Sequence, residues 1–428
     1  MALTWRAVVL TAVGVVPVLL FPAPGTVLAW GLLVLALCVL DAALAASPRL
    51  VALRREAPTG SVRLHQVSQS RLLLTHTGRR RLRALVRDAW PPSAGAGSNR
   101  HLVSLPPGES TRVRTALQPT RRGTLRADRV TIRTAGPLGL AGRQVSLTVP
   151  GELRVLPEFA SRRHLPSRLA RLREMDGRAA VQVRGQGTEF DSLREYVVGD
   201  DVRSIDWRAS ARRADVVVRT WRPERDRRVL LVLDTSRTSA ARVGDAPRLD
   251  AQIEAALLLA ALAGRAGDRV ELVAYDRGLR ARVAGVAGAR LMPAMAEALA
   301  GVEPALVETD WPGVVGQVTE RLSRRGLVVL LSALEPAAVE AGLLGVVDQL
   351  TARHQVVLAG VRDPEVEQLR ADRSDLMAAA AAERTELERS AVAALLRGRG
   401  VEVVDALPDD LAPRLADTYL ALKAAGRL

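Results

Sequence analysis

A run of about 20 apolar residues near the amino terminus is the feature that most constrains the fold. Residues 26–46 carry one charge, Asp41, near their far end. A helix of this length spans a hydrocarbon core of ~30 Å. A shorter uncharged run, 7–21, precedes it, and residues 22–25 contain two prolines and a glycine that separate the two runs. We therefore predict a transmembrane helical hairpin over residues 1–48. A signal peptide is the alternative for the first run, but no convincing cleavage site precedes the second.

The arginines around these runs predict the orientation of the hairpin. Arg6 precedes the first run, Arg49, Arg54, Arg55 and Arg63 follow the second, and the link between the runs is uncharged. Positively charged flanks stay on the cytoplasmic side of a membrane. We therefore expect a multi-pass protein of the cell membrane, with the bulk of the chain in the cytoplasm.

Charge is unevenly distributed along the chain. Residues 49–228 contain 37 arginines and 17 acids, a net charge of +20, whereas residues 229–428 carry a net charge of −5. This basic middle region could face anionic lipid or nucleic acid. Aromatic residues make up only 3% of the chain, too few for a protein that stacks on bases, so nucleic-acid binding is not expected. One cysteine and five histidines exclude a disulfide framework and a multi-histidine metal centre.

Hydrophobic periodicity divides the rest of the chain into three parts. Residues 49–157 contain short alternating stretches separated by turn residues, which predicts an all-β, sandwich-like domain. Residues 227–428 alternate continuous apolar strands with helices, which predicts a mostly parallel sheet covered on both faces. The expected strands here are 229–233, 269–275, 280–284, 327–331, 355–361 and 401–404. The expected helices are 249–263, 289–300, 312–323, 337–350, 374–397 and 411–425. Residues 158–226 form a linker that contains a charged segment.

That charged segment, residues 187–212, is named the signature segment below. It reads Gly-Thr-Glu-Phe-Asp-Ser-Leu-Arg-Glu-Tyr-Val-Val-Gly-Asp-Asp-Val-Arg-Ser-Ile-Asp-Trp-Arg-Ala-Ser-Ala-Arg. Acids and arginines at this density can satisfy each other through bidentate bonds. We interpret it as a structural clasp or a docking surface. The residues assigned to this role are Glu189, Phe190, Leu193, Arg194, Tyr196, Gly199, Asp200, Arg203, Asp206, Trp207, Ser210 and Arg212.

The signature segment resembles that of the domain of unknown function 58 family. The shared pattern runs Glu-Phe, Leu-Arg-x-Tyr, Gly-Asp, Arg-x-Ile-Asp-Trp and Ser-Ala-Arg, and the stretch Gly136-Pro-Leu-Gly-Leu140 and the membrane hairpin also match. The resemblance implies a von Willebrand factor A-like, Rossmann-like α/β domain at the carboxyl end. It also implies an adaptor or assembly role beside a MoxR-type AAA+ ATPase and other membrane proteins, not a defined reaction.

A metal-ion-dependent adhesion site is the candidate binding site. Asp234, Ser236 and Thr238 follow the first α/β strand, and one carboxylate with hydroxyls suits a hard ion such as Mg²⁺. By resemblance to von Willebrand factor A domains, Thr309 is a further ligand. The last expected aspartate is Ala333 here, and neither Asp310 nor Glu335 stands at the matching position. We therefore expect no cofactor, or weakly held Mg²⁺; alternatively, Asp234 only caps the turn that follows it.

Three functions compete on this sequence. The leading prediction is a membrane-anchored, non-enzymatic adaptor that presents the α/β domain to a cytoplasmic ATPase or its client. The second is a metal-dependent hydrolase that uses Asp200, Asp201 and Asp206, and the third is a binder of anionic lipid or nucleic acid through the basic middle region. No catalytic residue is assigned. With Lys423 as the only lysine, the chain contains no Walker motif, so energy from ATP would come from a partner.

Overall fold

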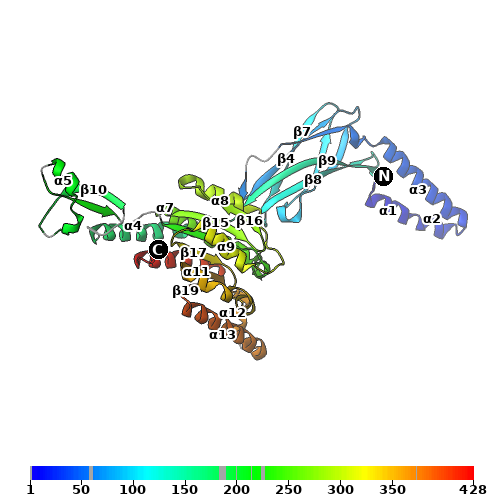
Figure 1. Ribbon diagram of the computed structural model, residues 1–428. Helices are drawn as coiled ribbons and strands as arrows, with labels where there is room; N and C mark the ends of the chain where they lie inside the picture. The colour runs from blue at the N-terminus through cyan, green and yellow to red at the C-terminus, as the bar shows by residue number, and fades with distance from the viewer. Residues whose placement is uncertain are drawn as a thin grey trace. The chain divides into compact units, whose positions relative to one another are not determined.

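The computed structural model describes residues 2–56, 61–182, 189–198, 200–213, 215–222, 227–372 and 374–428. The chain divides into two compact units, Met1–Glu158 and Phe159–Leu428 (Figure 1). The first unit contains apolar helices and a β-sandwich-like region, and the second contains a mixed α/β sheet. At this level of detail the predicted architecture is confirmed.

The first unit begins with a short strand and three apolar helices. They are β1 (Ala2–Leu3), α1 (Trp5–Val13), α2 (Val15–Leu20) and α3 (Pro24–Leu44). Ala7 of α1 packs with Val34 and Cys38 of α3, and a Cβ atom at Gly14 would lie 2.2 Å from Trp30, so glycine permits the helices to approach closely. One helix, within the span Pro24–Leu50, is long and apolar enough to cross a membrane. The helices over Trp5–Leu20 are apolar but shorter.

Two β-sheets follow the helices. The first sheet has the order β1-β9-β8-β5-β6, with β3 also paired to β9, and the second has the order β2-β4-β7. The strands are β2 (Val51–Glu56), β3 (Val62–Arg63), β4 (Ser68–His76), β5 (Leu82–Asp88), β6 (Arg100–Leu105), β7 (Ser110–Leu117), β8 (Gly123–Ala135) and β9 (Ala141–Leu156), with 3₁₀ turns at Pro48–Leu50 and Pro92–Ala94. All pairs are antiparallel except β3–β9. Alternate side chains of both sheets form one apolar core, for example Leu72 and Leu74 with Val86 and Ile132.

A buried ion pair joins the two sheets. Arg55 of β2 donates to both carboxylate oxygens of Asp88 in β5, at 2.8 and 3.1 Å. Trp90 Nε1 and Ser70 Oγ donate to the same carboxylate at 3.0 Å each. The bidentate geometry and the additional donors satisfy a charge pair that would be costly to bury alone.

Asp41, the one charge of α3, is fully buried against a turn between β8 and β9. Its carboxylate accepts hydrogen bonds from the backbone N–H groups of Leu138 and Leu140, both at 2.7 Å, and of Ala141 at 2.9 Å. A Cβ atom at Gly136 would lie 2.2 Å from Asp41 Oδ1, so only glycine allows this approach. A carboxylate in the last turn of a helix is unfavourable beside the helix dipole, and the N–H groups of the turn offset that cost.

Arginines of the sandwich complete the joint at the end of α3. Arg143 Nε donates to the carbonyl of Ala42 at 2.9 Å, and Arg80 Nη1 donates to that of Leu44 at 3.0 Å. The short strand β1 pairs with the start of β9. Cations complement the carboxyl end of a helix. Within the first unit, therefore, α3 is joined to the sandwich by bonds to its last turn.

The second unit begins with a helical segment and the hairpin that carries the signature. These elements are a 3₁₀ turn at Ala160–His164, α4 (Leu165–Gln182), β10 (Glu189–Glu195), a 3₁₀ turn at Val202–Ser204, α5 (Trp207–Arg213) and β11 (Val217–Arg222). Strands β10 and β11 pair in antiparallel register, from Glu189↔Arg222 to Glu195↔Val217. The sequence did not predict α4 or this hairpin.

The α/β sheet has the order β16-β15-β12-β17-β18-β19, parallel except for β16. Its strands are β12 (Arg228–Asp234), β15 (Arg269–Tyr275), β16 (Leu279–Val283), β17 (Leu327–Leu331), β18 (Gln355–Val361) and β19 (Val401–Ala406). Its helices are α6 (Arg237–Ala240), α7 (Arg248–Arg265), α8 (Leu291–Ala300), α9 (Trp311–Arg321), α10 (Pro336–Ala341), α11 (Val347–Thr351), α12 (Pro364–Ala371), α13 (Leu376–Gly398) and α14 (Pro408–Ala424). A two-residue pair, β13 (Arg242–Val243) with β14 (Ala246–Pro247), and 3₁₀ turns at Gly288–Arg290 and Leu343–Gly345 complete the unit.

Helices cover both faces of this sheet. Leu231 and Leu233 of β12 belong to one apolar cluster together with side chains of α7, α8 and α14. Leu230 and Val232 belong to a second cluster, with side chains of α9, α11 and α13. Burial on both faces explains why these strands are apolar without alternation.

The helix predicted over residues 337–350 is wrong in one respect, because the structure breaks it into α10 and α11. The break begins at Gly342, where a Cβ atom would lie 2.3 Å from the indole of Trp311. Helix α12, like α4, was not predicted from the sequence. Its capping residue, Asp363, accepts a hydrogen bond from the Glu365 amide at 2.9 Å.

Candidate functional site

The candidate site lies where the strand order of the sheet reverses. From β12 the chain moves to β15 on one side, whereas from β17 it moves to β18 on the other. In open α/β sheets the crevice beyond the carboxyl ends of two such strands is the usual ligand site. Asp234 is the last residue of β12, and Ser332 directly follows β17.

Hydrogen bonds bring the predicted residues together around Asp234, which is only 3% exposed. Oδ1 accepts from the Ser236 amide and from Thr309 Oγ1, both at 2.9 Å. Oδ2 accepts from Thr238 Oγ1 at 3.3 Å and from Ser332 Oγ at 2.5 Å. Ser236 Oγ lies 3.2 Å from Thr238 Oγ1. Asp234, Ser236, Thr238 and Thr309 therefore form one cluster, drawn from loops distant in sequence.

Ser332 is the member of this cluster that sequence reasoning missed. The resemblance directed attention to position 333, where Ala333 is buried. The available signal was a hydroxyl residue at the carboxyl end of a continuous apolar strand, one position earlier.

The cluster does not fit a tightly held Mg²⁺ ion. A carboxylate offers about four acceptor positions, and one amide with three hydroxyls fills them here. Neither possible substitute supplies a second carboxylate. Asp310 caps α9 through the Gly313 amide at 3.1 Å, and Glu335 pairs with Arg248 at 2.6 Å. Among the residues that the structure describes, no group of three His, Cys, Asp or Glu side chains could hold a metal ion.

Asp276, at the end of the neighbouring strand β15, is a second buried acid at this edge. Its carboxylate accepts from Arg280 Nε at 2.7 Å, from the Arg277 amide at 2.5 Å and from Thr235 Oγ1 at 3.1 Å. Burial works to raise the pKa of Asp276, but these hydrogen bonds outweigh it, so the pKa lies below its ordinary value. The charged carboxylate therefore stabilises the loop after β12 through Thr235.

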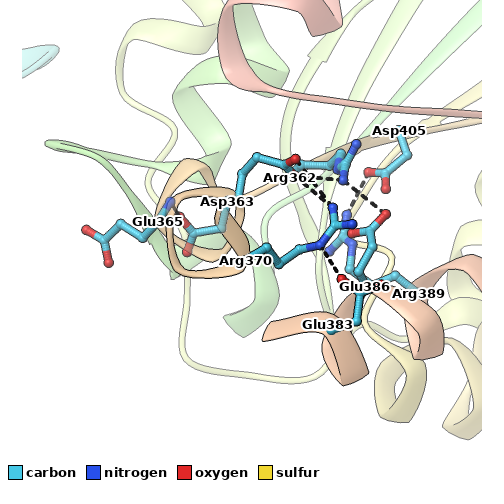
Figure 2. A network of polar contacts seen from close by, with 9 residues as sticks. Arg362, Asp363, Glu365, Arg370, Glu383, Glu386, Arg389 and Asp405 are labelled. Carbon is cyan, nitrogen blue, oxygen red and sulfur yellow. Dashed lines mark hydrogen bonds and ion pairs between the residues drawn. The ribbon is translucent and has the colours of Figure 1, made fainter. Parts of the chain in front are cut away.

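A third polar cluster lies near the carboxyl ends of β18 and β19, and Figure 2 shows most of its residues. It consists of Arg362, Arg370, Arg389, Glu367, Glu383, Glu386 and Asp405. Arg389 Nη2 lies 2.6 Å from Asp405 Oδ1, and Arg362 Nη2 lies 3.0 Å from carboxylate oxygens of both Glu367 and Glu386. Burial raises the pKa of Asp405, although Arg389 opposes the shift. These bonds join α12 and α13 to the strand ends, a structural role that no local sequence pattern indicated.

In the signature segment, the acids bond to neighbouring groups. Asp206 begins α5, where its Oδ1 accepts from the amides of Arg208 and Ala209 at 3.1 and 3.0 Å. Its Oδ2 accepts from Arg219 Nε at 2.9 Å, and Ser210 Oγ accepts from the Val217 amide at 3.0 Å. The Ala209 amide and Arg219 hold the pKa of Asp206 below its ordinary value. These bonds fasten α5 to β11.

The loop before α5 is held in the same manner. Asp200 accepts from Arg194 Nη2 at 2.5 Å and from the Val197 amide at 3.0 Å, and Arg194 is the main cause of its lowered pKa. Asp201 accepts from the Arg203 amide at 2.9 Å. The acids proposed for a hydrolase are therefore used in local turns and caps.

The remaining predicted residues of the signature segment are placed as follows. Leu193 lies in β10 and Tyr196 just after it, both half-buried, and the Tyr196 amide donates to the Val216 carbonyl at 2.8 Å. Arg203 and Arg212 are exposed. The backbones of Glu189 and Phe190 belong to β10, but their side chains lie outside the described residues, as does all of Gly199.

The signature segment exposes large apolar side chains beside these bonded acids. Trp207 is 70% exposed and Val198 94% exposed, and Val197 and Val202 are exposed as well. Exposed apolar side chains that cluster in one segment indicate an interaction surface more often than isolated ones do. The sequence interpretation placed Trp207 beside a carboxylate but did not predict its exposure.

Comparisons with known proteins match part of the second unit to a family. Residues 192–398 match the family described as "Protein of unknown function DUF58". Uncharacterized proteins of Mycobacterium tuberculosis and Mycobacterium bovis are 26% identical over 187 residues, which is 43% of this chain and 58% of theirs. The chain thus spans little more than half the length of these relatives.

Among solved structures, the matches fall on β-rich domains. PapD-like domain 7 of human CEP192 is 13% identical, with a TM-score of 0.20, over 26% of this chain and 89% of that domain. A CARDB domain of Pyrococcus furiosus is 14% identical, with a TM-score of 0.19, over 27% of this chain and 92% of that domain. Scores this low carry no argument, so the sandwich-like description rests on the two sheets themselves. The family match therefore shows a DUF58 family domain at residues 192–398.

Proposed function

We propose that the chain is a membrane-anchored, non-enzymatic adaptor whose α/β unit docks a cytoplasmic AAA+ ATPase of the MoxR type, or the client of that ATPase. In this proposal the α/β unit is a von Willebrand factor A-like domain. The strand order and the Asp234 cluster at the reversal point support that assignment. Asp234 is only 3% exposed, and its carboxylate accepts from one amide and three hydroxyls, an arrangement that joins loops instead of presenting a free base to a substrate.

One observation carries the proposal: the signature segment engages Asp200, Asp201 and Asp206 in local bonds and exposes apolar side chains. Asp200 and Asp206 are engaged by Arg194, Arg219 and backbone amides. A catalytic acid pair would instead need carboxylates free to reach a substrate or metal. Trp207, which is 70% exposed, is of a residue type that is enriched at interface hot spots.

The membrane anchor in this proposal is a hairpin made of α1–α2 and α3. Large apolar side chains point outward along both arms, including Val8 and Leu19 on one and Leu28 and Leu35 on the other. Lipid is the environment in which such a surface is stable. The arginines that flank the hairpin favour a cytoplasmic location for the remaining chain.

The partner follows from the family resemblance and from the lack of a Walker motif in this sequence. The test is binding of the full chain, reconstituted in nanodiscs, to a purified MoxR-type ATPase from the same organism. Trp207→Ala should weaken binding by roughly tenfold or more, because a central tryptophan is often worth 2 kcal/mol or more at an interface.

Leu376→Ala provides the matched control, since Leu376 is an equally exposed apolar side chain of the same unit. It should leave the affinity unchanged. If Trp207→Ala and Leu376→Ala lowered the affinity equally, or if neither changed it, the signature segment would not be part of the interface. Hydrolytic turnover by the purified chain that Asp206→Asn abolishes, with folding intact, would refute the non-enzymatic part of the proposal.

A further inference from the structure

Arginines gather at the amino-terminal edge of the α/β sheet, opposite the Asp234 edge. Strands β12, β17 and β18 are in register there, with Val229 opposite Leu327 and Leu327 opposite Gln355. Adjacent strands lie about 4.8 Å apart. The residues at the start of these strands therefore lie side by side. They are Arg227 and Arg228, Arg324 and Arg325, and Arg353 and His354.

These side chains line two cavities that share Arg325. One cavity, of about 180 Å³, is lined by Arg227, Arg228, Val229, Arg325, Gly326, Leu327 and Leu428. The other, of about 320 Å³, is lined by Thr319, Leu322, Ser323, Arg324, Arg325, Arg353 and His354. The basic edge, defined here as Arg227, Arg228, Arg324, Arg325 and Arg353, is thus hollowed and not flat.

The potential at this edge is positive. Burial lowers the pKa of His354, and the charge of Arg353 lowers it further. His354 is 7% exposed, and its Nδ1 has no hydrogen-bond partner among the described residues. Two acids of the same domain are engaged by other cations, since Asp348 pairs with Arg399 and Glu402 with Arg427.

Helix ends account for only part of this arrangement. Arginines near the carboxyl ends of α9 and α11 complement the helix dipoles, which explains Arg324 and Arg353 individually. Arg227 instead precedes the central strand β12, and Arg228 is the first residue of that strand. Residues 229–428 carry a net charge of −5, so the basic edge stands out on an otherwise acidic domain.

We propose that the basic edge binds the phosphate groups of an anionic phospholipid surface. Guanidinium groups match phosphate oxygens in bidentate geometry, and the two cavities can each admit a headgroup. No Phe, Trp or Tyr lines either cavity, which disfavours single-stranded nucleic acid. The inference that the phosphates belong to a bilayer rests on the membrane anchor proposed above, and it does not depend on the ATPase partner. Docking by this edge would turn the Asp234 edge away from the bilayer.

The test uses the full chain in nanodiscs of neutral phosphatidylcholine or of phosphatidylcholine with phosphatidylglycerol. An environment-sensitive fluorophore is attached at Ser323→Cys, in the second cavity, on a Cys38→Ala background. The anionic discs should shift the emission to the blue and the neutral discs should not. The shift should vanish at about 0.5 M salt, because screening shortens the range of the attraction.

Variants assign the effect to the basic edge. Arg325→Gln and Arg353→Gln should each lower the docked-to-free ratio about fivefold, since one arginine near an anionic surface contributes about a factor of five. Arg242→Gln, Arg290→Gln and Arg384→Gln change the charge equally at exposed positions elsewhere and should leave the ratio unchanged. Insertion of the chain into neutral discs tests the proposed anchor. The anchor proposal and the basic-edge proposal can therefore be refuted independently of each other.

Three results would overturn the inference. Equal shifts in neutral and anionic discs would show that phosphatidylglycerol is not recognised. A larger shift with a single-stranded oligonucleotide than with anionic discs would assign the edge to nucleic acid. Saturation by millimolar inorganic phosphate in neutral discs would assign it to free phosphate instead of a membrane surface.

Discussion

Asp41 and Asp234 are both buried carboxylates, yet different kinds of donor hold them. Asp41 accepts from three backbone N–H groups of a single turn. Asp234 accepts from one backbone N–H and three hydroxyls, of Thr238, Thr309 and Ser332. The first carboxylate joins a helix to a sheet within one unit, and the second joins loops at the reversal point of the other.

The difference in donors implies a difference in adaptability. A backbone N–H can only donate, and its direction is fixed by the turn that carries it. A hydroxyl can rotate, and its oxygen can accept a hydrogen bond or coordinate a cation as well as donate. Asp41 is therefore a permanent structural joint, whereas the Asp234 cluster can be redirected towards a ligand or an added ion.

The largest expected effect follows from breaking the Asp41 joint. Asp41→Asn leaves one acceptor oxygen for three N–H groups and points an amide donor at the turn. We expect the first unit to lose about 3 kcal/mol of unfolding free energy, because buried donors lose a charged acceptor. Hydrogen exchange of the Leu138, Leu140 and Ala141 amides in the detergent-solubilised chain measures this directly.

Asp128→Asn is the control for this change, since Asp128 is an exposed aspartate of the same unit. It should alter stability by no more than about 0.5 kcal/mol. If Asp41→Asn left the three amides as protected from exchange as the control does, the turn would be held by other contacts. Asp41 would then not be the structural joint that the comparison with Asp234 assumes.

The second effect is smaller because hydroxyls can adapt. Asp234→Asn should cost about 2 kcal/mol of unfolding free energy, since rotated hydroxyls can still find an acceptor. Thermal unfolding of the full chain and exchange of the Ser236 amide test this. Asp245→Asn, at a fully exposed residue, is the matched control. A loss as large as that of Asp41→Asn would show that the hydroxyls are as rigid as amides.

Sequence patterns predicted much of the Asp234 cluster because of a general property of parallel sheets. Strands 269–275, 327–331 and 355–361 have the predicted bounds, since continuous apolar runs buried on both faces are distinctive. Carboxyl ends of parallel strands meet at one edge, so Asp234 and Ser236 were expected there. Thr309 came from the resemblance. Ser332 was missed because one residue along a strand changes which face a side chain occupies.

The Asp41 joint was not predictable from local sequence. The apolar run shows one charge, and its partners lie about 100 residues further along the chain. The stretch from Gly136 to Leu140 was noted only for its family resemblance. Nothing in either segment indicates that a carboxylate would meet the turn, because the contact depends on tertiary packing. The break at Gly342 depends in the same way on a distant indole, that of Trp311.

The third prediction concerns acid stability at the same edge of the α/β sheet. The pKa of Asp276 is lowered in the folded chain, so its contribution is fully present above the ordinary pKa of an aspartate, about 3.9. That contribution is lost as the pH falls through the lower, folded pKa. Arg280→Gln removes one donor that depresses this pKa, so acid unfolding should begin at a higher pH. Urea midpoints measured across the acidic range test this. If the urea midpoint of Arg280→Gln depended on pH in the same way as that of the unmodified chain, the Arg277 amide and Thr235 would be sufficient to keep the pKa of Asp276 low.

The smallest effect on stability, and the sharpest test of adaptability, comes from restoring a second acid at the Asp234 cluster. Ala333 is buried beside Ser332 at the end of β17. Ala333→Asp should lower stability by about 1 kcal/mol without a cation, since two carboxylates repel each other. Mg²⁺ should reverse that loss, because two carboxylates with hydroxyls and waters suit a hard ion. Calorimetry and thermal unfolding with and without MgCl₂ measure both effects.

Ala337→Asp, at an exposed position of α10, controls for the added charge and should show no response to Mg²⁺. The unmodified chain should bind Mg²⁺ weakly, if at all, because a single carboxylate with its acceptor positions filled gives a strongly hydrated ion little reason to lose water. Micromolar affinity in the unmodified chain that Asp234→Ala abolishes would contradict this. It would mean that the hydroxyls already turn their oxygens towards the ion, so that the Asp234 cluster binds Mg²⁺ without a second acid. Protection of the Leu138 amide should stay independent of Mg²⁺ in every variant, since a backbone N–H cannot exchange its role for that of a ligand.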